Sequence, residues 1–325
     1  MEQIKELIKY AVRAPSGHNT QPWKFIVFES EIQIHPDHTR VLPVVDSDNH
    51  ALWISLGCAL ENLVIAGGKF GFKSEVNISS EDKDRTFIKV KLFSLDKQRP
   101  DELFDYIGTR QSTRNEYEAI NLSVQDLNVL KTCFDIQGIN ARFFSQDEIK
   151  VLEPFIIEGS NLQFKNKKFV TELVSWFRFF EKEAKEKGDG LWTACMGLPK
   201  MNRFIGNIVM KHFVSAKSEA KRWKKLIHSS SGLVLFVADK NDIEHWVNLG
   251  RAFQRFGLTA AKLNISHAHV NMPCEEIEVR KQMTKSLDLT GKHPLLLIRF
   301  GYSDKMTYSF RRPVEDVIFK KDAYI

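Results

Sequence analysis

Cysteine is scarce in this sequence. Only 4 of the 325 residues are cysteines, and no two lie close enough to form a CxxC pair, which excludes the usual structural zinc sites and dithiol redox centres. Cys58 lies in an apolar helical stretch and is expected to be a core residue; the others are Cys133, Cys195 and Cys274. We therefore expect a reduced, cytoplasmic protein.

Long hydrophobic runs and a targeting segment are also missing. No apolar stretch is expected to reach the ~20 residues of a membrane-spanning helix. The N-terminal segment carries Glu2, Lys5, Glu6 and Lys9, unlike the apolar centre of a signal peptide. The sequence therefore predicts a soluble protein with no membrane partner.

Charge of one sign is not concentrated in any segment. The net charge is +6, but lysines and arginines are interspersed with acidic residues. No helix-turn-helix signature or basic tail is present, so no nucleic-acid partner is predicted. Binding of a small anion by a few arginines fits this pattern better. A GxGxxG dinucleotide-binding motif is also missing.

Phenylalanine, in contrast, is abundant. The chain has 24 copies and is 43% hydrophobic overall, which favours wide apolar surfaces in a core or a covered pocket. The spacing of apolar residues predicts both helices and strands, hence an α+β fold. Helices are expected at about 4–12, 50–66, 101–109, 169–187 and 246–263, and strands at 23–28, 32–35, 86–93, 232–238 and 295–300.

Two of the predicted helices share a sequence pattern. Residues 53–59 and 246–252 both follow W-I/V-x-L-G-x-A. Gly57 and Gly250 each cost a helix about 1 kcal/mol, and a close approach between the two helices would offset that cost. We therefore predict an internal duplication in which the long helices of the two halves cross at the centre of the molecule.

The repeat divides the chain into halves at 1–100 and 101–325. A lysine-rich and aromatic segment at about 150–225 interrupts the second half. It is either a passive surface subdomain or a cover over a ligand, because long insertions in compact folds are often functional. In the second interpretation residues 170–200 lie over the ligand, with Trp176, Phe180 and Trp192 facing it.

Three polar segments are candidate binding elements. Residues 13–23 form a dense polar loop that either contacts a ligand or caps its own turn. Arg110 and Arg114 flank Ser112, a spacing that lets two guanidinium groups converge on one phosphate, or pair with nearby acids. Arg311 and Arg312 precede a proline near the C-terminus, as a second cationic pair or a solvated end.

Together these segments resemble motifs of the nitroreductase family, in particular its fused-repeat branch of Acg-like flavoproteins. Pro15, Ser16, Asn19 and Gln21 match a PSxxNxQPW loop; Arg110, Ser112 and Arg114 match an RxSxR segment; Arg311 and Arg312 match a C-terminal basic-proline element. In that family these elements bind flavin mononucleotide (FMN) at a dimer interface. The resemblance implies that they contact FMN here.

The resemblance also implies a particular architecture. Each half would carry a small mixed or antiparallel sheet flanked by helices, and the two halves would mimic a nitroreductase dimer in one chain. Only one set of motifs is present, so one FMN site per chain is implied and a monomer suffices to build it. Backbone amides near the flavin ring would come from the stretch containing His267, Ala268 and His269.

The implied activity is that of an FMN-dependent NAD(P)H oxidoreductase. The flavin would pass a hydride or electrons from NAD(P)H to a nitroaromatic, quinone or similar small-molecule acceptor. No catalytic side chain is then required. The alternative is a non-catalytic protein that stores or sequesters FMN beneath the insertion.

Overall fold

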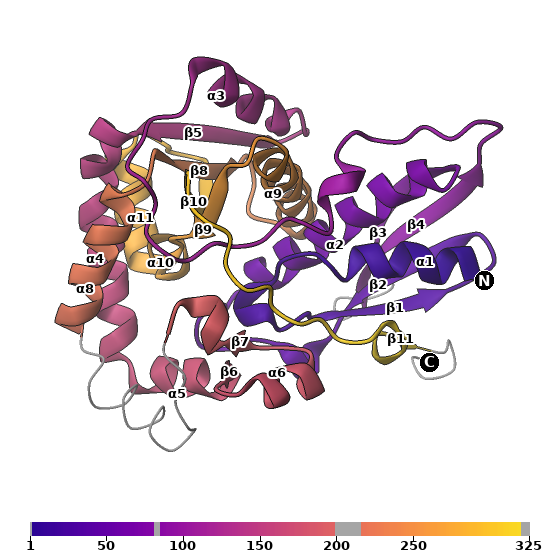
Figure 1. Ribbon diagram of the computed structural model, residues 1–325, viewed down its shortest axis with the longest axis horizontal. Coiled ribbons are helices and arrows are strands. Elements are labelled where there is room, and N and C mark those ends of the chain that lie inside the picture. The colour runs from indigo at the N-terminus through magenta and orange to yellow at the C-terminus, as the bar shows by residue number, and fades with distance from the viewer. Residues whose placement is uncertain (1, 81–84, 199–215, 320–325) are drawn as a thin grey trace.

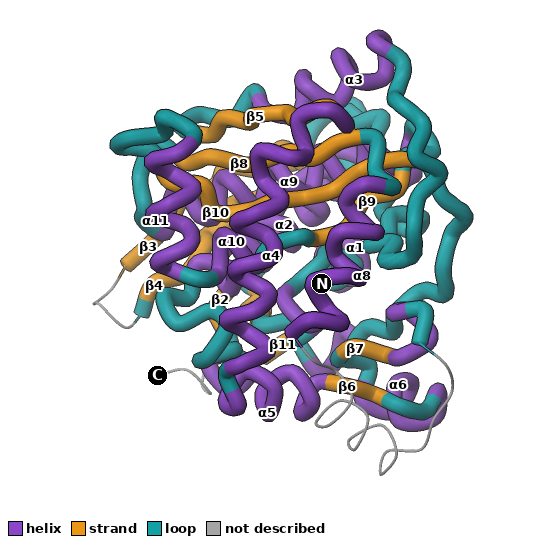
Figure 2. The backbone as a smooth tube through the Cα atoms, turned by 90° about the vertical axis from the view of Figure 1, so that its left-hand side faces the viewer, coloured by secondary structure: helices purple, strands orange, loops and turns teal. Residues whose placement is uncertain are grey.

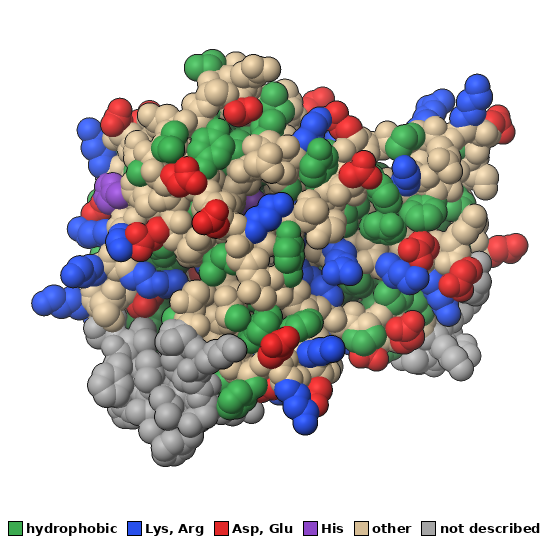
Figure 3. Space-filling model, viewed as in Figure 1, with side chains coloured by type: hydrophobic (Ala, Val, Ile, Leu, Met, Phe, Trp, Pro, Cys, Tyr) green, Lys and Arg blue, Asp and Glu red, His purple; other side chains and the backbone are tan. Residues whose placement is uncertain are grey.

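The computed structural model describes residues 2–80, 85–198 and 216–319. It confirms the α+β class: a mixed five-stranded sheet and an antiparallel four-stranded sheet lie on either side of two long helices, α2 (His50–Lys69) and α9 (Ile243–Lys262) (Figure 1). On the face drawn in Figure 3, acidic and basic side chains are interspersed.

The first sheet is built mainly from the N-terminal part of the chain. Helix α1 (Glu2–Ala11) precedes β1 (Trp23–Val27) and β2 (Glu31–Pro36), and α2 separates these from β3 (Phe72–Ser80) and β4 (Thr86–Ser94). Neighbouring strands follow the order β11–β1–β2–β4–β3. The edge strand β11 (Ile318–Phe319) comes from the C-terminal segment and runs parallel to β1, so the end of the chain ties the two halves together.

The second sheet has the same internal order. It comprises β5 (Ile139–Ser145), β8 (Gly232–Ala238), β10 (His293–Gly301) and β9 (Ser266–His269), in that spatial order and all antiparallel. Its strands therefore correspond to β1, β2, β4 and β3, and α9 connects its second and third strands along the chain as α2 does in the first sheet.

Helices α2 and α9 cross where the sequence pattern repeats. A Cβ atom added to Gly57 would lie 2.1 Å from the carbonyl oxygen of Val247, and one added to Gly250 would lie 2.1 Å from that of Ile54. Each glycine thus contacts the backbone of the other helix at the equivalent position. The predicted close crossing is confirmed, and its physical basis is the lack of a side chain at both residues.

Helix α2 also corrects an expectation. It is long and apolar enough to cross a membrane by length and composition, although no such stretch was expected. In this fold 83% of its most apolar window is buried inside the protein. The hydrophobicity of α2 is therefore accounted for by its central position between the two sheets.

The insertion consists of two parts. Helices α4 (Ile149–Lys165) and α8 (Ala216–His228) lie side by side against the second sheet (Figures 1 and 2), where Ile149, Leu152 and Ile156 join its apolar core. Between them come α5 (Lys167–Trp176), β6 (Phe177–Arg178), α6 (Glu181–Lys187) and β7 (Leu191–Trp192), which extend toward the first half. Residues 199–215 of the insertion lie outside the described residues.

Several predicted elements differ from the structure. The helix expected at 169–187 is broken by β6, and the one expected at 101–109 is only a 3-10 turn at Phe104–Tyr106. Strands β3, β5 and β9 and helices α3 (Val124–Lys131), α4, α10 (Met272–Glu275) and α11 (Ile277–Ser286) were not predicted. Most of these are short or half-exposed, so their apolar periodicity is weak.

Candidate functional site

A cavity of about 410 Å³ lies where the two halves and the insertion meet. This volume is within the range of small-molecule and cofactor sites, roughly 300–1,000 Å³. The walls come from the loop after α1, residues 107–114, β9, α10, the C-terminal segment around 307–311 and the insertion. Segments distant in sequence therefore build one binding space.

The cavity brings together most of the residues that the sequence motifs indicated. Those in its walls are Pro15, Ser16, Asn19, Arg110, Ser112, Arg114, His269 and Arg311. They come from all three motif segments and from β9, so the structure assembles the segments around a common space.

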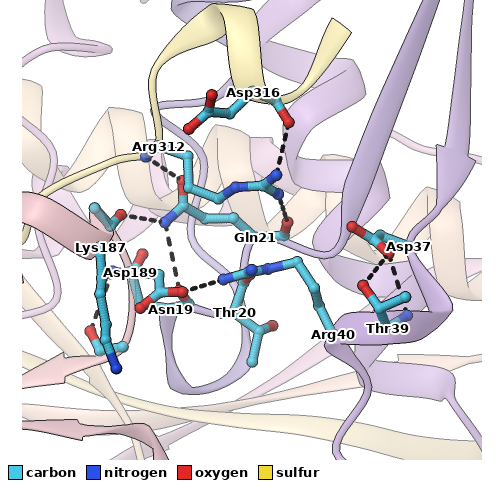
Figure 4. Close-up of polar contacts among 12 residues, drawn as sticks. Asn19, Thr20, Gln21, Asp37, Thr39, Arg40, Lys187, Asp189, Arg312 and Asp316 are labelled. Carbon is cyan, nitrogen blue, oxygen red and sulfur yellow. Dashed lines mark hydrogen bonds and ion pairs between the residues drawn. The ribbon is translucent and has the colours of Figure 1, made fainter. Parts of the chain in front are cut away.

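Four of the residues expected to contact the cofactor do not line the cavity. Gln21 is completely buried, donates to the Gly188 carbonyl at 2.7 Å and accepts from the Arg312 amide at 2.9 Å. The side chain of Arg312 turns to the carbonyls of Gln21 and Asp316 (Figure 4). Neither side chain lines the cavity, and both are bonded to other parts of the protein; contact of Gln21 and Arg312 with the cofactor stays a prediction.

The other two residues, His267 and Ala268, lie on β9. His267 is 1% exposed, and its ring lies within about 3.1 Å of where a Cβ on Gly257 would stand. Its carbonyl accepts from the Thr113 amide at 2.9 Å. Ala268 is buried opposite Arg299 of β10. Both side chains pack inside the protein, and of this stretch only His269 lines the cavity. The contact of its backbone amides with a flavin ring stays a prediction.

Three arginines in the cavity wall lack a carboxylate partner among the described residues. Arg110 donates to the Arg13 carbonyl at 3.1 Å, and Arg311 donates to Ser309 Oγ at 2.7 Å and the Phe310 carbonyl at 3.0 Å. Arg114 donates to the carbonyls of Ser112 and Cys195. Each is held by neutral oxygens, so the positive charge at this end of the cavity is uncompensated.

The electrostatic consequence appears in their pKa values. Burial lowers the pKa of Arg110 to about 10 and, together with repulsion from Arg110 and Arg13, that of Arg311 to about 9. Burial also lowers the pKa of Arg114. All three remain protonated at neutral pH, at a free-energy cost that an anionic ligand would relieve.

Unsatisfied polar atoms point to the same end of the cavity. The Nε atoms of Arg110 and Arg311 are buried without a hydrogen-bond partner in the described parts of the chain, as is Oδ1 of Asn19. Such atoms are costly in a folded protein. Two spare cationic donors and one spare acceptor match a ligand that carries both an anionic group and a heterocyclic N–H.

The loop after α1 has an unusual backbone. His18, Asn19 and Gln21 have φ values of 47°, 55° and 51°, in the left-handed region that non-glycine residues rarely adopt. Ser16 Oγ accepts from the Gln21 amide at 2.9 Å. Ser16 therefore bonds to the backbone of its own loop, as one interpretation predicted, and it also lines the cavity, while its contact with a ligand stays a prediction.

Two buried carboxyl groups in the cavity wall were not foreseen from the sequence. Asp46 and Glu275 lie in the wall, and burial raises the pKa of both carboxyl groups. Asp46 caps α2 by accepting from two backbone amides, and Glu275 accepts from Gln163 and Asn271. The cavity wall therefore contains buried carboxyl groups as well as the three arginines.

The insertion contributes apolar walls, although not through the side chains expected. Trp176 stacks on Arg40 and Arg178, Trp192 packs against Phe310, and Phe180 is 49% exposed. None of these three lines the cavity. The insertion side chains that do so include Phe164, Phe169, Leu173, Phe177, Leu191 and Trp223.

Comparison with known proteins shows what this chain is similar to. Residues 1–46 match the nitroreductase family model. The Mycobacterium tuberculosis protein Rv3131, provisionally named an NAD(P)H nitroreductase, is 21% identical over 336 positions, which cover 98% of this chain and 91% of that protein. These matches confirm the resemblance to the nitroreductase family.

Two further nitroreductase relatives show narrower similarity. The acg protein of M. tuberculosis, also provisionally named an NAD(P)H nitroreductase, is 32% identical over 73 residues, 22% of each chain. The crystal structure of the FMN-dependent nitroreductase NfnB from Mycobacterium smegmatis in complex with NADPH is 12% identical, with a TM-score of 0.39, and covers 61% of this chain and 86% of that chain.

Proposed function

We propose that this chain binds one FMN in the cavity and acts as an NAD(P)H-dependent oxidoreductase on a small organic acceptor. The observation that carries the proposal is the set of three arginines, Arg110, Arg114 and Arg311, that face one cavity without a carboxylate partner among the described residues. Arginine suits phosphate because its donors are fixed in a plane and its charge is permanent.

Each of these residues would bind the part of the cofactor that suits its chemistry. The guanidinium groups of Arg110, Arg114 and Arg311 would hold the phosphate. Asn19 offers an amide group to the flavin ring, and Ser16 and Ser112 offer hydroxyl groups to the polar linker. When bound, FMN would supply the capacity to accept a hydride and pass electrons on.

The chain's own residues would control solvent and charge around the ring. Phe169, Leu173 and Phe177 exclude water from the insertion side of the cavity, which strengthens electrostatic interactions inside it. Burial lowers the pKa of His18 to about 4 and that of His269 to about 3, so both rings are neutral near pH 7. Neither therefore competes with the arginines for the phosphate.

We also infer that the two halves arose by duplication and that a single chain builds the site. This inference is supported by the equal strand order of the two sheets and the reciprocal contacts of Gly57 and Gly250. Because the cavity draws on both halves of one chain, no second copy is required for it. A reduced, cytoplasmic location remains part of the proposal.

Storage of FMN without catalysis is the second candidate. It is favoured by the insertion, since side chains from α4, α5, β6, β7 and α8 all line the cavity and restrict the space beside a bound flavin. The two functions differ in whether a nicotinamide reaches the ring.

Anaerobic titration of the FMN-loaded protein separates them. An oxidoreductase loses its flavin absorbance on addition of NADH or NADPH and regains it when a nitroaromatic or quinone is added. A storage protein keeps its absorbance with either nucleotide, although dithionite still bleaches it. Failure of the flavin-free protein to bind FMN at all would contradict both candidates.

A further inference from the structure

A turn of the insertion forms hydrogen bonds with the loop after α1, which lines the cavity. This turn, residues 188–190, is called the Asp189 turn below. Asn19 Nδ2 donates to the Gly190 carbonyl at 3.1 Å, while the Gly190 amide donates to the Asn19 carbonyl at 3.2 Å. Gln21 Nε2 donates to the Gly188 carbonyl at 2.7 Å. Two side chains of the loop thus donate hydrogen bonds to the turn.

The loop needs such support because its conformation is unfavourable by itself. Three non-glycine residues have positive φ, a conformation that is costly and persists only where surrounding structure holds it. Neighbouring elements also contribute: the Arg312 amide donates to Gln21 Oε1, and Asn19 Nδ2 donates to the Phe310 carbonyl. The loop is therefore fixed between the Asp189 turn and the C-terminal segment (Figure 4).

The turn is fixed in its place by buried charges. Asp189 pairs with Arg178 of the insertion, with an Nη2–Oδ1 distance of 2.7 Å, and with Arg40 of the first half. The side chains of Asp189 and Arg178 are 9% and 5% exposed, so this pair is shielded from solvent. Arg40 also donates to the Thr20 carbonyl inside the loop. Arg40 thus connects the loop to the turn directly.

The turn also requires its glycine. Gly188 has φ of 62°, and a Cβ atom there would lie 2.7 Å from the Arg311 carbonyl oxygen. The turn therefore packs against the backbone of a residue whose side chain lines the cavity. Loop, turn and C-terminal segment form one packed unit behind the arginine end of the cavity.

We propose that Asp189 is a positioning residue: through Arg40 and the carbonyls of its turn, it holds residues 17–21 in the shape that receives FMN. This inference rests on the proposed function, because the ligand is the FMN assigned there. The insertion then serves cofactor retention, in addition to shaping the acceptor side of the cavity.

Two variants test the inference by independent routes. Asp189→Asn removes the charge shared by both arginines, and Arg40→Gln breaks the connection to the first half while leaving the Arg178 pair intact. Glu186→Gln is the matched control, since it removes one negative charge from the same part of the insertion and that side chain is 65% exposed. None of the three side chains lines the cavity.

Two readouts are needed. Amide hydrogen exchange of the flavin-free protein reports on the loop without any contribution from cofactor, and quenching of FMN fluorescence gives the dissociation constant. We expect exchange in residues 16–22 to accelerate at least about fivefold in Asp189→Asn and Arg40→Gln, with FMN affinity reduced about tenfold, the equivalent of ~1.4 kcal/mol. Once saturated with FMN, both variants should match the unaltered protein in NAD(P)H oxidation.

Different failures have different meanings. If the unaltered protein binds FMN but exchange or affinity is unchanged in the folded Arg40→Gln protein, the inference is overturned and the proposed function stands. An equal loss of FMN affinity in Glu186→Gln also overturns it, because a general charge effect then explains the result. If the unaltered protein binds no FMN, the proposed function fails, and the inference fails with it.

Discussion

Arg311→Gln should make the flavin-free protein more stable while it weakens FMN binding. In the flavin-free state burial and repulsion from Arg110 and Arg13 lower the pKa of Arg311 to about 9. Each tenfold change in a proton dissociation constant corresponds to about 1.4 kcal/mol. The charge on Arg311 therefore destabilises the flavin-free protein by on the order of several kcal/mol. Because the side chain faces an open cavity, solvent screening should reduce this cost by roughly half.

The hydrogen bonds of Arg311 offset part of that gain. The guanidinium donates to Ser309 Oγ, to the Phe310 carbonyl and more distantly to the Ser309 carbonyl. Such bonds contribute about 1 kcal/mol each, and glutamine can replace one of them. The expected net stabilisation is about 1 kcal/mol, equivalent to a rise of roughly 1–2 °C in the melting temperature of a chain of this size.

Ligand binding should change in the opposite direction. Loss of one charge-assisted hydrogen bond to phosphate costs about 1.5–3 kcal/mol, so the FMN dissociation constant should rise tenfold or more. Differential scanning calorimetry of the flavin-free protein and a fluorescence titration measure the two effects.

Arg251→Gln provides the contrast. Arg251 Nε donates to Glu61 at 2.8 Å, and the Glu61 side chain is only 2% exposed. Removal of this paired arginine should lower the melting temperature and leave FMN affinity unchanged. A lower melting temperature for Arg311→Gln together with unaltered FMN affinity would refute the assignment of Arg311 to an uncompensated anion site.

Three further predictions follow from the geometry. Gly250→Ala places a methyl group against the Ile54 carbonyl and should lower the free energy of unfolding by about 3 kcal/mol or more, measured by urea denaturation. Burial raises the pKa of Asp48, but hydrogen bonds from His50 and Arg280 outweigh this effect and hold the pKa below its usual range. Asp48→Asn should therefore be less stable than the unaltered protein at pH 7, by on the order of 1–3 kcal/mol. The difference in stability should shrink as the pH falls below about 4. Flavin released by denaturation should amount to one FMN per chain, and a reproducible ratio near two would contradict the single cavity site.

The sequence alone determined the features that depend on local or repeated patterns. The pattern around Gly57 and Gly250 predicted both long helices and their crossing, because a missing side chain in an apolar helix has a direct steric meaning. The motif residues Asn19, Arg110 and Arg311 were found from spacing and resemblance, and all three face the cavity. These properties are encoded over short stretches of chain.

Only the tertiary structure decided how the polar groups are used. An amide such as that of Gln21 can serve a ligand or a neighbouring turn, and its partner at Gly188 is 167 residues away in sequence. Asp46 and Glu275 meet in the cavity wall because a loop and a short helix converge there. No periodicity records such contacts.

The insertion also shows what sequence composition cannot predict. Its abundance of aromatic residues favoured a cover, yet Trp176 and Trp192 pack elsewhere while the less conspicuous Leu173 lines the cavity. Composition measures how much apolar surface a segment must bury. Which side chain faces a ligand depends on where the chain turns, as at β6, and on what already occupies the neighbouring space.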